Sequence, residues 1–271
     1  MKTAIASPLS WPDAAAILET SFFDGIRAPL RQLQIQSKDS WPMLDQLNEL
    51  SLRADARNPA GLPLRFVMPQ SEATSAMHYE THIAKTGEVP TRDNWHDLFN
   101  ALQWIVFPQM KSCLNAQHVR LLAAGGAKEA TARSTPRDVL TMFDESGVVV
   151  ASADESLLAL IRDFDWRTLF VERRRDVEAN MRFLLVGHGL MEKSLRPFIG
   201  LTAKAMLLNI DANNTSMDLM VAGWLKDDAN LQTSHRLAPL PLLGIPGWDA
   251  RNNLPSFYEN TDYFRPGRRV R

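Results

Sequence analysis

The chain has 271 residues, of which 45% are apolar and 23% are charged. These proportions are typical of a globular protein with a sizeable core, and they exclude wholesale disorder. The formal net charge of −1 argues against a general attraction to nucleic acid or to an anionic membrane surface. No apolar run approaches the ~18 residues that a membrane-spanning helix needs.

The single cysteine and the start of the chain indicate where the protein resides. Cys113 cannot form an internal disulfide bond, and a secreted protein with one lone cysteine is uncommon. No apolar stretch of the length found in signal peptides precedes Pro8 and Pro12. We therefore predict a cytoplasmic protein in which Cys113 is an inert, partly buried thiol.

The prolines divide the chain into three parts. Half of the 16 prolines lie in the first 90 residues and five more lie after residue 235, and proline ends helices because it lacks a backbone donor. We predict a single globular domain over 1–271, with an irregular arm over 1–90, a helical core over 91–210 and an irregular arm over 211–271. Both arms contain aromatic residues and should pack onto the core, since disordered tails lack such residues. These are Trp11, Phe22, Phe23, Trp41, Trp224, Trp248, Phe257, Tyr258 and Phe264.

Short elements are predicted for the N-terminal arm. Helices should cover Trp11–Thr20 and Trp41–Asp55, the second because its leucines recur at helical spacing. Leu64–Met68 fits a strand, and Met77–Thr86 fits either a strand or a short helix.

A long helix is predicted over Asn94–Asn115, where apolar residues form one face. Asp93 is the expected N-cap, and Pro108 should kink the helix or split it. Gly125-Gly126 marks a loop after it.

Residues 138–152 are predicted to form a small antiparallel hairpin. Val139–Phe143 and Val148–Ser152 would be its strands, because consecutive valines favour strands. The residues Asp144–Gly147 between them are typical of a turn. The expected fold class is therefore α+β, a helix-rich single domain with a small antiparallel hairpin or sheet and proline-rich, aromatic-containing arms at both ends.

Three segments follow the hairpin. Asp154 should be the N-cap of a helix over Ser156–Asp163, and a second helix should cover Thr168–Leu195. Leu201–Ile210 fits either a helix or a strand.

The common motifs of nucleotide-binding and hydrolytic enzymes are absent. The sequence contains no Walker A motif, no GxGxxG, no GxSxG, no HExxH and no CxxC. An active site would therefore have to combine residues from distant segments, and three polar clusters are candidates.

The first cluster lies on the predicted helix that begins near residue 94. Arg92, His96 and Asn100 are four residues apart and would share one helix face. A guanidinium and an amide can hold an anion there, and the imidazole can serve as a general base. The alternative is a polar helix face whose histidine is satisfied by its neighbours.

The second cluster belongs to the predicted hairpin. Asp138 would stand at the start of a strand, and Asp144 with Glu145 would lie in the turn. Carboxylates on loops can bind magnesium or manganese. Acidic turn residues can equally be solvated and only shape the turn.

The third cluster is Gly187-His188-Gly189 with Glu192. His188 and Glu192 are four residues apart, so one helix face could present both to a metal ion. A glycine inside a helix costs about 1 kcal/mol relative to alanine. The two glycines therefore indicate close packing, a ligand or a break in the helix, and the alternative for His188 is a buried histidine at a helix crossing.

Several segments together form a longer pattern from about residue 79 to residue 266. They are Gly87–Leu102, Pro108–Asn115, Arg137-Asp138, Thr141–Gly147, Gly187-His188, Glu192-Lys193, Leu201–Lys204, Pro241–Trp248, Phe257-Tyr258 and Phe264–Pro266. In this order they resemble a bacterial family of uncharacterised proteins, the DUF3025 family. Ser146 departs from the asparagine expected in the family, although both residues suit a tight turn. The resemblance implies no reaction, cofactor or partner, but it implies that the polar clusters belong to a shared site.

Two functions remain open. The first is a metal-assisted hydrolase acting on a phosphate or ester bond, with a divalent metal as its cofactor. Its candidate catalytic residues are His96, Arg92 and Asn100, and its candidate metal ligands are Asp138, Asp144, His188 and Glu192. It requires these segments to converge within a few ångströms.

The alternative is a non-catalytic protein-binding or adaptor protein that uses its aromatic-rich arms and whose polar clusters are structural. Binding of nucleic acid through Arg173–Arg175 and the basic tail is disfavoured by the near-neutral charge.

Overall fold

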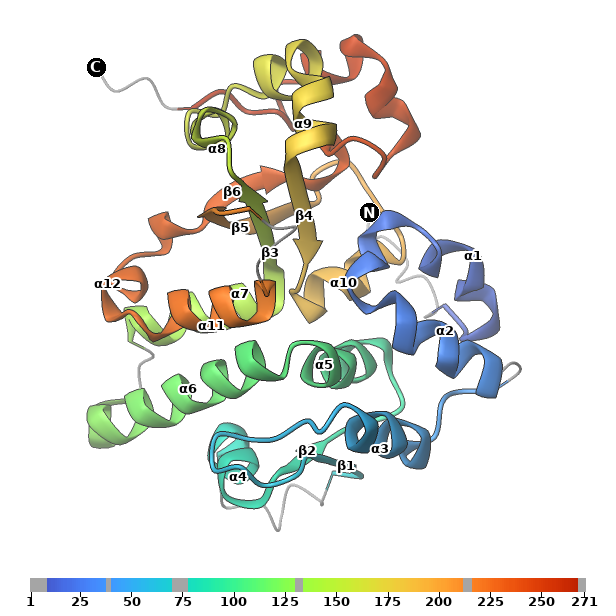
Figure 1. The fold of residues 1–271 in the computed structure, drawn as a ribbon, viewed down its shortest axis with the longest axis vertical. Helices are drawn as coiled ribbons and strands as arrows, with labels where there is room; N and C mark the ends of the chain where they lie inside the picture. The colour runs from blue at the N-terminus through green and yellow to red at the C-terminus, as the bar shows by residue number, and fades with distance from the viewer. Residues whose placement is uncertain (1–8, 38–39, 70–77, 130–133, 212–215, 268–271) are drawn as a thin grey trace, which may run out of the picture.

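The computed structural model describes residues 9–37, 40–69, 78–129, 134–211 and 216–267. Helices dominate the fold, and two small β-sheets accompany them (Figure 1). The predicted α+β class is therefore confirmed. Within these described ranges, no helix is both long enough and apolar enough to cross a membrane.

Four strands form the larger sheet, namely β3 (Gly147–Ser152), β4 (Met181–Leu185), β5 (Thr202–Asn209) and β6 (Ala238–Pro241). Their order is β4-β3-β5-β6. β3 pairs antiparallel with β4 and parallel with β5, and β5 pairs antiparallel with β6. Every residue of β3 is buried, which explains its unbroken run of small and β-branched residues, because a strand covered on both faces needs no polar side.

The α-helices of the described residues are α1 (Ala15–Leu18), α2 (Arg27–Gln36), α3 (Leu44–Arg53), α4 (Tyr79–Thr86), α5 (Trp95–Val106), α6 (Pro108–Glu129), α7 (Thr135–Ser146), α8 (Glu155–Arg162), α9 (Arg174–Asn180), α10 (His188–Ser194), α11 (Met217–Lys226) and α12 (Asp228–Leu231). α5 and α6 cross the middle of the molecule (Figure 1). On the side of the larger sheet, α10 packs against α5, and α7 and α11 pack against α6. On the other side lie α3, α4 and a two-stranded parallel sheet of β1 (Arg65–Val67) and β2 (Glu88–Pro90).

Both arms contain short 3-10 segments beside regular helices, so they are less irregular than predicted. The 3-10 segments are Pro12–Ala14, Ser21–Ile26, Ser234–Arg236, Leu242–Gly244, Ala250–Asn253 and Pro255–Glu259. Their aromatic side chains nevertheless join the buried core, as predicted. In the N-terminal arm, Trp11 stacks on Trp95 with ring centroids 5.4 Å apart, and Phe23 stacks on Phe99 at the same distance of 5.4 Å. The N-terminal arm therefore supports the buried side of α5.

The predicted hairpin over 138–152 is wrong in its first half, because this half belongs to helix α7. Val139, Leu140 and Phe143 are buried in that helix, and they recur at helical spacing. Burial of this face outweighed the strand preference of a single valine. The second predicted strand is present as β3, but its antiparallel partner is β4.

The helix predicted over Thr168–Leu195 is also wrong. A π-helical turn over Thr168–Glu172 and α9 precede strand β4, and α10 follows it. The pairing of β4 with β3 is a long-range contact that helix propensity cannot reveal. Gly125-Gly126, predicted as a loop, lies within α6.

Other predictions are confirmed or decided. Pro108 splits the long helix into α5 and α6, and Asn94 rather than Asp93 caps α5. Asp154 caps α8 as predicted. The two segments left open are helix α4 and strand β5.

Candidate metal centre and its cavity

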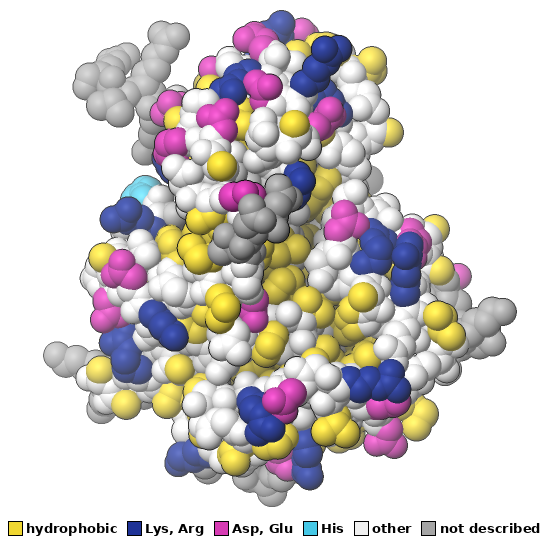
Figure 2. Space-filling view, in the orientation of Figure 1, with side chains coloured by type: hydrophobic (Ala, Val, Ile, Leu, Met, Phe, Trp, Pro, Cys, Tyr) yellow, Lys and Arg dark blue, Asp and Glu magenta, His cyan; other side chains and the backbone are white. Residues whose placement is uncertain are grey.

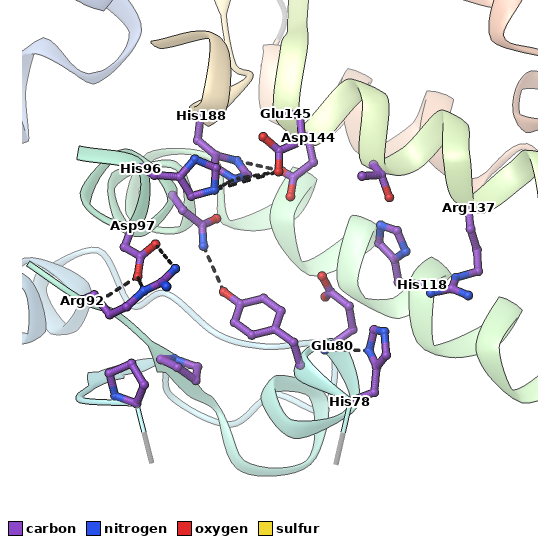
Figure 3. A pocket seen from close by; sticks show the side chains of 15 residues that line it. His78, Glu80, Arg92, His96, Asp97, His118, Arg137, Asp144, Glu145 and His188 are labelled. Atoms are coloured by element: carbon purple, nitrogen blue, oxygen red, sulfur yellow. Dashed lines mark hydrogen bonds and ion pairs between the residues drawn. The ribbon is translucent and has the colours of Figure 1, made fainter. Parts of the chain in front are cut away.

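Helices α5, α7 and α10 meet at a cavity of about 400 Å³. Figure 3 shows side chains from α5, α6 and α7 turned toward it, together with His188 from α10. Six of the residues singled out from the sequence line this one cavity, namely Arg92, His96, Asn100, Asp144, Glu145 and His188. The segments of His96, Asp144 and His188 therefore converge on one cavity, whereas the predicted ligands Asp138 and Glu192 do not line it.

The cap of α5 orients His96. Asn94 precedes the helix, and its side-chain oxygen accepts a hydrogen bond of 2.8 Å from the backbone N–H of Asp97. The helix then buries Trp95 and Phe99 in the core. His96 lies about 100° around the helix from Trp95, and its imidazole points into the cavity (Figure 3).

A polar face of α7 forms another wall. Arg137, Thr141 and Asp144 line the cavity, and their spacing of four and three residues places them on one side of a helix. Glu145 follows Asp144 and also lines the cavity. The opposite face holds Phe143 in the core.

Two glycines allow α10 to approach this wall. A Cβ on Gly187 would overlap the backbone of Ser146 and Gly147, and the N–H of Gly187 donates to the carbonyl of Gly147 at 2.8 Å. A Cβ on Gly189 would overlap Oε2 of Glu145. The glycines flanking His188 therefore permit its close approach to Glu145, which is the close packing that the sequence indicated.

Three donor atoms in the cavity surround one point. Nε2 of His188 lies 3.1 Å from Nε2 of His96. Oε1 of Glu145 lies 3.6 Å from the first of these nitrogens and 3.9 Å from the second. A triangle with these sides has a circumradius of about 2.1 Å, which matches the length of a bond between Zn²⁺ and histidine nitrogen or carboxylate oxygen. One divalent ion can therefore contact all three atoms and keep further coordination positions for water or substrate.

The surroundings of both imidazoles favour metal binding through Nε2. Burial lowers the pKa of His188 to about 4, the main cause being the loss of solvent around the charged form. His188 is therefore neutral near pH 7 and keeps a lone pair for a metal ion. Nδ1 of His96 lies 3.3 Å from Oε2 of Glu192. A proton held on Nδ1 by this carboxylate leaves Nε2 of His96 as the free donor, a common arrangement behind metal-bound histidines.

An ion pair between Lys111 and Asp144 lies next to His188. Nζ of Lys111 lies 2.6 Å from Oδ1 of Asp144, and the same oxygen lies 3.8 Å from Nδ1 of His188. Burial alone would raise the pKa of Asp144, but the neighbouring Lys111 ammonium contributes to holding it below its usual value. Asp144 was predicted as a metal ligand. In the structure it contacts His188, which provides one of the three donor atoms, and is not itself one of the three.

Hydrogen bonds also hold the side chains at the Arg92 end of the cavity. The guanidinium of Arg92 donates to both carboxylate oxygens of Asp97, at 2.8 and 3.1 Å. The amide of Asn100 donates to the hydroxyl of Tyr79 at 3.0 Å. A phenol has an ordinary pKa of about 10, so this hydroxyl is protonated near pH 7 and can donate to a ligand.

The remaining predicted residues are placed as follows. Glu192 contacts His96 rather than the shared point, and Asp138 is exposed in the first turn of α7 and does not line the cavity. The sequence singled out Glu145 as one of two acidic turn residues but did not include it in the final set of candidate ligands, and it did not indicate Lys111 or Tyr79 at all. A helical reading of residues 137–145 would have placed Glu145 beside the cavity, because it lies two turns after Arg137.

Comparison with known proteins gives a family. A model described as "Protein of unknown function (DUF3025)" matches residues 64–268, which is most of the chain and confirms the resemblance. The matched range contains His96, Glu145, His188 and Glu192. Neither a curated protein nor a solved structure matches the chain.

Proposed function

This chain belongs to the DUF3025 family, and we propose that it is a metal-dependent hydrolase of a phosphate or ester bond in a small substrate. His96, His188 and Glu145 would hold one divalent ion. The observation that carries the proposal is the triangle of donor atoms with sides of 3.1, 3.6 and 3.9 Å. Two histidines and one carboxylate with an open position are a ligand set of hydrolytic zinc sites.

The chemistry follows from the ligand set. A divalent ion held by His96, His188 and Glu145 would lower the pKa of a bound water and so would supply the nucleophile. The phenol of Tyr79, held by Asn100, is placed to donate to the negative charge that develops on the substrate. Arg92, fixed by Asp97, adds a positive charge at the same end of the cavity.

The arms give less support to a binding or adaptor protein. Figure 2 shows Lys and Arg mixed with Asp and Glu over one face, with hydrophobic side chains gathered in the hollow between its upper and lower parts. Trp11, Phe23 and Phe264 are each less than 5% exposed, so these aromatic side chains contribute to the core rather than to a docking surface. The predicted cytoplasmic location is part of this proposal and rests on the lone buried Cys113, whereas the predicted bacterial origin rests on the family resemblance alone.

Metal content tests the site directly. The full chain, purified without a tag or chelator, should contain about one equivalent of zinc, manganese or iron by mass spectrometry. His188→Ala and His96→Ala should each abolish this content. His235→Ala, a substitution in an exposed 3-10 turn, is the matched control and should leave it unchanged. A wild-type protein that binds no divalent ion, even after reconstitution, would refute the site.

Cleavage of p-nitrophenyl phosphate and p-nitrophenyl acetate tests the reaction. Metal-loaded wild type should cleave one of them, and the His188→Ala variant should not. Stoichiometric iron with oxygen consumption and no cleavage of any ester would retain the metal site and refute hydrolysis, because two histidines and a carboxylate also occur in oxygen-activating iron proteins.

A further inference from the structure

The buried side chains of His118 and Arg137 line the cavity at the end away from His96. Figure 3 shows His118 on α6 and Arg137 on α7 at this end. Each has only 6% of its surface exposed. Thr141, one turn after Arg137, lines the same wall.

Nδ1 of His118 is buried and has no hydrogen-bond partner among the described residues. A buried polar group without a partner costs about 1–3 kcal/mol, so such groups in proteins are nearly always satisfied. A buried imidazole nitrogen on a cavity wall therefore needs a partner inside the cavity, which a water molecule or an oxygen of a bound ligand can supply.

The nearby acidic side chains are already engaged. Glu80 accepts a hydrogen bond of 2.6 Å from the amide of Asn115, and Asp144 is paired with Lys111 at 2.6 Å. The guanidinium of Arg137 adds a buried positive charge to the same wall. Arginine is the side chain best suited to phosphate and carboxylate groups, because its planar donors match their oxygens.

We propose that His118, Arg137 and Thr141 form a subsite for an anionic oxygen group of the substrate, a phosphate or a carboxylate. As a substrate subsite it rests on the proposed function, because the bond to be cleaved would lie at the His96, His188 and Glu145 end. The substrate class is then a small molecule with a cleavable ester or phosphoester at one end and a second anionic group at the other. The cavity of about 400 Å³ is within the size range of small-molecule sites.

Calorimetric titration of the metal-free full chain with inorganic phosphate, and separately with acetate, tests the subsite. One saturable equivalent should bind to the wild type, and the affinity should fall at least tenfold in both His118→Ala and Arg137→Gln. Tighter binding of phosphate assigns a phosphate group to the substrate, and tighter binding of acetate assigns a carboxylate. Because Arg137 is buried and its replacement can disturb folding, His118→Ala and Thr141→Val are the decisive variants, and circular dichroism verifies their folding.

Two arginine variants locate the anion. Arg162→Gln removes an exposed charge paired with Glu155 and should leave phosphate binding unchanged. Arg92→Gln alters the opposite end of the cavity and should weaken phosphate binding much less than His118→Ala does. Loss of binding in Arg92→Gln with full binding in His118→Ala would overturn the proposal, as would the absence of any saturable binding.

Metal measurements separate the two proposals. His118→Ala should keep the wild-type metal content, whereas His188→Ala should lose the metal and still bind phosphate. Phosphate binding in a protein that never takes up metal would retain the subsite and refute the proposed function. Metal uptake without anion binding would do the reverse.

Discussion

Gly189→Ala should separate metal binding from folding. The new Cβ would overlap Oε2 of Glu145, the far end of a flexible side chain. To restore ordinary contact, this carboxylate has to withdraw by about 1 Å. Metal ligands tolerate deviations of only ~0.2 Å, so Glu145 would no longer share the ion with His96 and His188.

The expected magnitudes differ for the two properties. Metal affinity should fall at least tenfold, which is about 1.4 kcal/mol. The stability of the metal-free protein should change by less than about 1 kcal/mol, because alanine is the better helix former and offsets part of the strain. Competition with a chromophoric chelator measures the first quantity, and urea unfolding of the metal-free protein measures the second.

Two other glycines provide controls. Gly223 lies in α11, and a Cβ there meets no atom within 4 Å, so Gly223→Ala should leave metal affinity unchanged. Gly187→Ala would overlap backbone atoms of Ser146 and Gly147, which cannot withdraw, and it should destabilise the metal-free protein by about 1–3 kcal/mol or more. Wild-type metal affinity in a folded Gly189→Ala variant would refute the role assigned to Glu145.

Further substitutions test the surroundings of the site. Glu192→Gln should weaken metal binding about 10- to 100-fold in a chelator competition, because the amide no longer holds the proton of His96 as a carboxylate does; unchanged affinity would contradict this. Lys111→Met should destabilise the protein by about 3–5 kcal/mol in urea unfolding, since Asp144 would remain charged in a buried position without its partner; a loss below 1 kcal/mol would show that Asp144 is not buried as described. Asp218→Ala removes a carboxylate that accepts hydrogen bonds from two backbone N–H groups in the first turn of α6, and it should cost about 1–2 kcal/mol, with a smaller loss for Asp218→Asn.

The clusters could be predicted from the sequence because each of them is local. The spacing of Arg92, His96 and Asn100, and the glycines around His188, are visible in short windows. Their partners were not predictable, because Nε2 of His96 and Nε2 of His188 meet across 92 positions of chain. Only the packing of α10 against α5 brings them together.

The hairpin error concealed one ligand. If Asp144–Gly147 formed a turn, Asp144 and Glu145 would both face solvent, and the sequence would not distinguish their roles. The helix gives them different roles, because successive residues on a helix point about 100° apart. Asp144 then faces Lys111 and Glu145 faces His96 and His188. A period of 3.6 through Val139, Leu140 and Phe143 was the available signal, and the β-preference of valine obscured it.

The stacking of Trp11 on Trp95 and of Phe23 on Phe99 has a consequence for where the protein can be cut. The family match begins at residue 64. Trp11 and Phe23, which cover Trp95 and Phe99 on the buried face of α5, both lie before that residue. A chain shortened to the matched range would expose two large aromatic rings beneath one wall of its own cavity, and burial of each ring is worth about 2–3 kcal/mol. The smallest piece of this protein that can be transferred to another chain, or produced alone, is therefore longer than the piece that similarity recognises.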